Sequence, residues 1–258
     1  KLCTMAAQHG LAPIRIGAYD ATLFRKVDED MTTVTTAATA LDTMVVTHWD
    51  STLNSSFDTS CRSIAAMPMT MSERACAASH TRVWRIIAGQ PNDPLEQQKV
   101  KELALHGGLR GGHMTPTSLR EGTDVAASDP DGEWFLILED DAYVCQYEFR
   151  YERGRRHSAG VVGGRPLLDF QHRVRRAVDA LPTEADLLYL GRAIPPSGRG
   201  PRQSGGLFKV KYAWQLHAYM IRRKTARFLL RELPVDAPAD NFIASRIHDG
   251  SLTAYATE

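Results

Sequence analysis

Short apolar runs and amphipathic stretches alternate along the chain. Residues 134–138 and 186–191 are almost continuously apolar, a pattern typical of strands buried on both faces of a sheet. Residues 13–20 alternate apolar and polar positions, and the segments 207–212 and 215–222 resemble further strands. These five segments are the strands that the pattern predicts.

A clear helix is predicted from residue 71 to about Gly89. Thr70 and Glu73 have the spacing of a capping box, and glycine is a common helix end. Apolar and small residues then recur at helical spacing: Cys76, Ser79, Val83, Ile86 and Ile87.

Further helices are expected around residues 167–181, 224–233 and 237–248. This alternation of strands and helices predicts an α/β fold with a mostly parallel central sheet flanked by helices. In such folds ligands bind at the carboxyl ends of the strands. Residues 90–132 carry Pro, Gly, Asn and Asp with little periodicity, so we expect a surface insertion there.

Composition narrows the class of protein. The 258 residues are 43% hydrophobic and 24% charged, which is ordinary for a globular chain of one large domain or two small ones. The net charge of +1 provides no whole-protein basic field, so we expect no nucleic-acid partner. No apolar run approaches the roughly 20 residues of a membrane span, so no transmembrane segment is expected.

Three carboxylates follow the first buried strand. In an extended chain Glu139 and Asp141 share one side while Asp140 faces the other. Two carboxylates on one side can hold a hard divalent cation. The alternative is that these acids end the strand and face water.

Other candidate residues lie on the helices. His80 precedes Trp84 by four positions and could bind a ligand, or could be a histidine packed between helices. Asp236 follows a helix end, where loops often carry function. Asp236 and Asp240 could equally cap the last helix.

Four segments, in order, resemble the family-25 glycosyltransferases, which include bacterial lipooligosaccharide galactosyltransferases and animal collagen galactosyltransferases. Residues 71–84 are similar to the family's Glu-x-x-Cys-x-x-Ser-His-x-x-x-Trp helix, and residues 135–141 to its Ile-Leu-Glu-Asp-Asp strand end. The third segment is 186–191. The fourth is 214–221 together with 234–236.

The resemblance implies a single GT-A-like domain that transfers a hexose, most often galactose, from a UDP-sugar to an acceptor hydroxyl with inversion. It implies Mn²⁺ or Mg²⁺ at Glu139 and Asp141, and a general base for which Asp236 and Asp240 are candidates. The donor pocket would be lined by Ser79, His80, Trp84 and Asp140.

The family's first strand has no counterpart in residues 1–258, so we expect it ahead of Lys1. The acceptor would be a glycan, a lipid-linked sugar or a protein hydroxyl. The compartment would be the endoplasmic reticulum or Golgi lumen for a eukaryotic chain, and the cytoplasmic membrane face for a bacterial one. Two alternatives stay open: a non-catalytic nucleotide-sugar or glycan binding protein of the same fold, and a metal-dependent phosphohydrolase.

Overall fold

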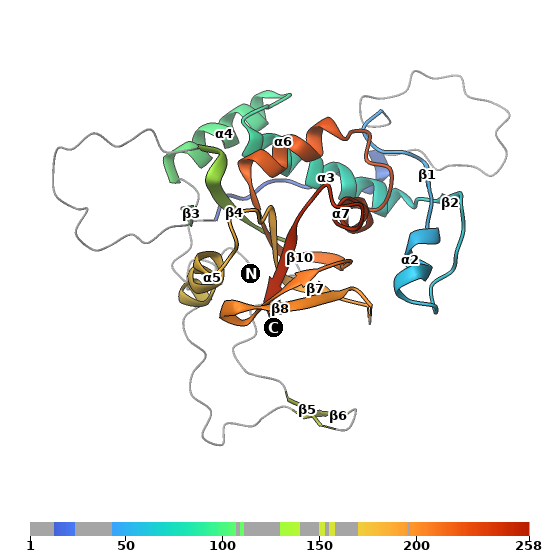
Figure 1. Cartoon of the computed structure of the whole chain (residues 1–258). Helices are drawn as coiled ribbons and strands as arrows, with labels where there is room; N and C mark the ends of the chain where they lie inside the picture. Colours follow the sequence, from blue (N-terminus) through green and yellow to red (C-terminus); the bar gives the residue numbers. More distant parts are fainter. Residues whose placement is uncertain are drawn as a thin grey trace, which may run out of the picture.

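A seven-stranded mixed sheet forms the centre of the protein (Figure 1). The computed structural model describes residues 13–23, 43–106, 109–110, 130–139, 150–152, 155–157, 170–195 and 197–257. In spatial order the strands are β3 (Leu109–Arg110), β4 (Glu133–Leu138), β10 (Trp214–Arg222), β7 (Leu187–Ala193), β11 (Ala254–Thr257), β9 (Leu207–Val210) and β8 (Arg199–Gln203).

The prediction of a mostly parallel sheet is wrong, because most neighbouring strands in the described sheet run antiparallel. Only β7 and β11 pair in parallel within it. The two apolar strands, β4 and β7, both pair antiparallel with β10, which lies between them. An apolar run reports burial on both faces but carries no information on strand direction, and this sheet is buried on both faces.

Helices cover the two faces of the sheet and create two apolar clusters (Figure 1). Helices α3 (Met71–Ala88), α6 (Arg223–Arg231) and α7 (Ala239–His248) pack on one face, and α5 (Phe170–Asp179) packs on the other. Along β4, Trp134 belongs to the α5 cluster and Phe135 to the opposite one. The mixed α/β architecture is therefore as the pattern predicts.

The remaining described elements are short, apart from α4 (Pro94–His106), which packs against α3. They are η1 (Ala21–Leu23), β1 (His48–Trp49), α2 (Thr52–Phe57), β2 (Met67–Pro68), η3 (Pro130–Gly132), β5 (Arg150–Glu152), β6 (Arg155–His157) and η4 (Ser204–Gly206). None of the helices in the described ranges is long and apolar enough to cross a membrane.

The strand predicted at residues 13–20 is absent, and the segment 90–132 contains a helix that was not predicted. Residues 13–20 form no strand, and lie instead along the α3 surface, where the Tyr19 amide donates to Ser79. The segment 90–132 contains helix α4, whose start carries Asp93 as a cap for the Glu96 amide at 2.8 Å and a proline at the first helical position. Both are known start signals that weak apolar periodicity concealed.

The predicted helix from residue 71 is confirmed together with its caps. The Thr70 hydroxyl accepts from the Glu73 amide at 3.1 Å, and the Glu73 carboxylate accepts from the Thr70 amide at 2.7 Å. Gly89 ends the helix with φ of 71°, in the left-handed region that glycine adopts without strain. This helix carries His80, so its start fixes where that residue lies.

Removing the cap should destabilise the protein measurably. We expect Thr70→Ala to lower the free energy of unfolding by about 1 kcal/mol, because the Glu73 amide loses its acceptor. Urea denaturation measures the change. The control Ser72→Ala removes an exposed hydroxyl two residues away and should change the free energy by under about 0.5 kcal/mol. Equal effects of the two substitutions would contradict a role for the cap.

Candidate functional site

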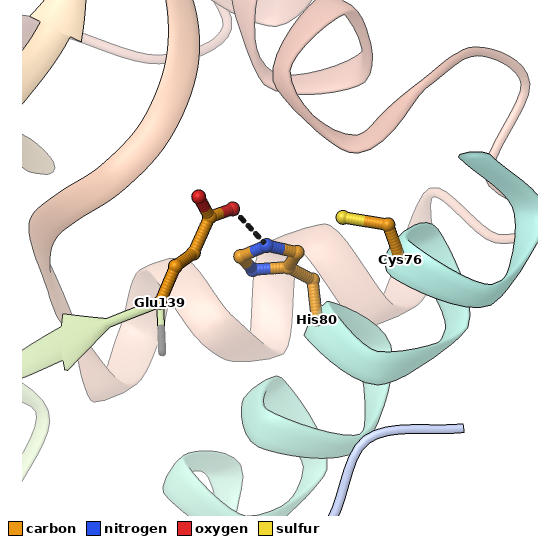
Figure 2. Close-up of side chains that lie close together, drawn as sticks. All are labelled: Cys76, His80 and Glu139. Carbon is orange, nitrogen blue, oxygen red and sulfur yellow. Dashed lines mark hydrogen bonds and ion pairs between the residues drawn. The ribbon is translucent and has the colours of Figure 1, made fainter. Parts of the chain in front are cut away.

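A single carboxylate, Glu139, joins α3 to the centre of the sheet. Glu139 directly follows β4, and its amide donates to the His217 carbonyl at 3.0 Å. Its Oε1 lies 3.2 Å from His80 Nε2 and its Oε2 lies 2.9 Å from His217 Nδ1. Because an ionised carboxylate only accepts, both histidines donate to it. Figure 2 shows the contact with His80.

His80 is held on its other side by two aromatic side chains. Its Nδ1 lies 2.8 Å from the Tyr219 hydroxyl, which also accepts from Trp84 Nε1 at 3.1 Å. Trp84 is fully buried and stacks near Phe242. Since His80 is itself only 6% exposed, these contacts leave its ring one orientation, with Nε2 directed at Glu139.

The cluster shifts the proton affinities of its members. Burial alone lowers the pKa of His80, but Tyr219, Cys76 and Glu139 outweigh it and hold the pKa well above its ordinary value. The hydrogen bond from His80, joined by that from His217, outweighs burial and lowers the pKa of Glu139. Burial raises the pKa of Tyr219. Both shifts favour the ionised form of Glu139 and the charged form of His80.

Cys76 completes the group from the turn of α3 that precedes His80. The two residues are four apart and lie on the same helix face. One ligand atom each from Cys76, His80 and Glu139 lie within 4.8 Å of one another. Figure 2 shows the Cys76 and His80 side chains extending from α3 toward Glu139. Unlike His80, Cys76 is exposed, so this side of the cluster faces solvent.

The structure brings His80, Trp84 and Glu139 together, with Trp84 reaching the site through Tyr219. Ser79 lies on the same helix, where its hydroxyl donates to Ala75 at 2.7 Å and accepts from the Tyr19 amide at 2.9 Å. Asp140 and Asp141 lie outside the described residues.

The two candidate bases lie near the start of α7. Both oxygens of Asp236 pair with the Arg246 guanidinium, at 2.8 and 3.0 Å. Asp240 accepts from the Gln215 amide at 3.0 Å. Gln215 has φ of 65°, which side-chain-bearing residues rarely adopt, and this hydrogen bond helps to hold it.

Sequence reasoning did not single out Cys76, His217 or Tyr219 as site residues. Each nevertheless has a readable position: Cys76 is one helical turn from His80, and His217 and Tyr219 are two apart on one strand. What the sequence lacks is the pairing of β10 with β4, which brings His217 and Tyr219 to the Glu139–His80 contact.

The described donors around Glu139 are two imidazoles and a thiol. Mn²⁺ and Mg²⁺ prefer oxygen ligands, and both Glu139 oxygens already accept from a histidine. The described residues alone therefore do not fit such a cation. Binding of Mn²⁺ or Mg²⁺ by Glu139 together with Asp141 stays a prediction.

Comparison of the chain with known family models, with curated proteins and with solved structures found no match.

The charged contact between His80 and Glu139 should give stability a defined pH range. The pKa of Glu139 is lowered from 4.5, so its contribution is complete above that pH and is lost as the pH falls through the folded-state pKa. The pKa of His80 is raised from 6.5, so its contribution is complete below that pH and is lost as the pH rises through the folded-state pKa.

We therefore expect Glu139→Gln to destabilise the protein most between about pH 4.5 and 6.5, and less on either side. Thermal melting of both proteins across this range, with a chelator present, gives the difference. A difference that does not vary with pH would contradict the charged contact.

Proposed function

We propose that this protein is a glycosyltransferase that moves a hexose, which the resemblance gives as galactose, from a UDP-sugar to an acceptor hydroxyl. One observation carries the proposal: three segments that carry the family resemblance meet in one hydrogen-bonded cluster. His80 comes from the helix segment, Glu139 from the strand end, and His217 and Tyr219 from the segment at 214–221. The two motifs with the most specific sequence therefore touch at the His80–Glu139 contact.

The cluster offers the polar groups that a nucleotide-sugar needs. Cleavage of the sugar–phosphate bond leaves negative charge on a diphosphate, which preorganised donors stabilise. The His217 side chain is 41% exposed and rests on Glu139, so its ring is held at the surface of the site. We assign His217 to a phosphate or sugar oxygen of the donor. His80 holds the other oxygen of Glu139, and Tyr219 holds His80.

Inversion in one step also needs a base for the acceptor hydroxyl. Of the two candidates, Asp240 suits this role better. Asp240 accepts from the backbone amides of Gln215 and Asn241, and Gln215 lies two residues from His217 on β10. Asp236 is instead paired through both oxygens with the Arg246 guanidinium. The acceptor is proposed only as a glycan, a lipid-linked sugar or a protein hydroxyl.

Calorimetric titration of UDP and UDP-galactose, with Mn²⁺, with Mg²⁺ and with a chelator, tests the proposal. We expect UDP and UDP-galactose to bind to the protein. We expect UDP-galactose to be consumed when a panel of acceptors is added. Dependence on Mn²⁺ or Mg²⁺ would support the oxygen site at Glu139 and Asp141. Binding without any turnover would favour a nucleotide-sugar binding protein. Hydrolysis of phosphate monoesters without UDP binding would favour a phosphohydrolase.

Glu139→Gln should reduce consumption of UDP-galactose by about 100-fold or more. The amide offers one acceptor oxygen where the carboxylate offers two, so one of the two histidines loses its partner. Release of UDP measures turnover.

The matched control is Glu102→Gln on α4, which removes the same charge from a surface pair with Lys99. It should keep the wild-type rate. Equal rates for wild type and both variants would exclude Glu139 from the reaction.

A further inference from the structure

The solvent-facing side of the His80–Glu139 contact has the composition of a transition-metal site. A thiol, an imidazole and a carboxylate converge there from two elements, with their ligand atoms within 4.8 Å of one another. Two of them share one face of α3, and the third enters from the end of β4 (Figure 2). We propose that Cys76, His80 and Glu139 bind a zinc ion.

The spacing of the two closest atoms suits zinc. Zn–N and Zn–O bonds of about 2.0–2.1 Å set tetrahedral ligand atoms about 3.3 Å apart. His80 Nε2 and Glu139 Oε1 are 3.2 Å apart, close to this separation. An ion bound to both atoms would lie beside the line that joins them, with the His80 ring tilted toward it. The Cys76 sulfur lies within 4.8 Å of both of these atoms, on an exposed side chain.

The donor types select the metal. Thiolate and imidazole suit Zn²⁺, whereas Mg²⁺ and Mn²⁺ are held by oxygen ligands. On binding, the Cys76 thiol and His80 Nε2 each release a proton to solvent, because the metal ligands are the thiolate and the unprotonated nitrogen.

The groups behind the ligands are those that orient a metal site. Tyr219 contacts His80 Nδ1, the ring nitrogen that does not face the ion, and Trp84 anchors Tyr219 in turn. His217 holds the second oxygen of Glu139. Such outer contacts fix ring orientation and raise metal affinity. Here Tyr219 and Trp84 are buried, and His217 is partly exposed.

Three protein ligands leave a fourth position on a tetrahedral ion. Structural zinc sites are closed by four ligands, whereas catalytic ones keep one position for water or substrate. Because Cys76 is exposed and the Glu139 side chain is 25% exposed, this position faces solvent. The inference goes beyond the proposed sugar transfer and does not depend on it.

Co²⁺ replaces Zn²⁺ with similar geometry and reports its ligands by absorption, so it is the probe for this test. We expect the wild-type protein to bind Co²⁺ with a thiolate-to-cobalt charge-transfer band that Zn²⁺ abolishes and Mn²⁺ does not. Cys76→Ser should abolish the band. Glu139→Gln should weaken Co²⁺ binding at least about tenfold.

Cys61→Ser is the matched control, because Cys61 is the other free cysteine in the described part of the chain. It should leave the band unchanged. Absence of the band in the wild type, or its persistence in Cys76→Ser, would overturn the proposal. These outcomes are separate from the proposed function. Binding of UDP-galactose without the cobalt band would refute only the zinc site. A cobalt band without binding of UDP-galactose would refute only the sugar transfer.

Discussion

The arrangement of this site depends on one carboxylate that accepts from two histidines. A histidine as buried as His80 requires partners for both ring nitrogens, and Tyr219 and Glu139 supply them. Glu139 is in turn held by His217 and by its own backbone bond to β10. The contact therefore connects α3, β4 and β10, and loss of Glu139 leaves the buried His80 without its Nε2 partner.

The two proposals assign different chemistry to the same residue. Sugar transfer uses the side of Glu139 that faces His217, and zinc binding uses the side that faces His80 and Cys76. An oxygen-coordinated Mn²⁺ or Mg²⁺ at Glu139 and Asp141 would compete with the histidines for these oxygens. A zinc ion at Cys76 and His80 would leave the contact with His217 in place. The two proposals therefore predict different metal preferences for this site.

Local signals in the sequence predicted much of the fold. The capping box at Thr70 and the apolar runs at 134–138 and 186–191 correspond to α3, β4 and β7, because caps and burial are properties of short segments. Strand direction was predicted wrongly, since it depends on β10 pairing between β4 and β7. His80 and Glu139 were identified by motif, but Cys76, His217 and Tyr219 became visible only when the sheet brought distant segments together.

The central claim is that the His80–Glu139–His217 cluster binds the ligand. Histidine side-chain NMR during titration of UDP-galactose tests it most directly, with resonances assigned by single histidine substitutions. The account predicts that the imidazole nitrogen signals of His80 and His217 shift together as the ligand saturates. His172, exposed on α5 against the opposite sheet face, should not change. Saturable binding that leaves both cluster signals unchanged would contradict the account.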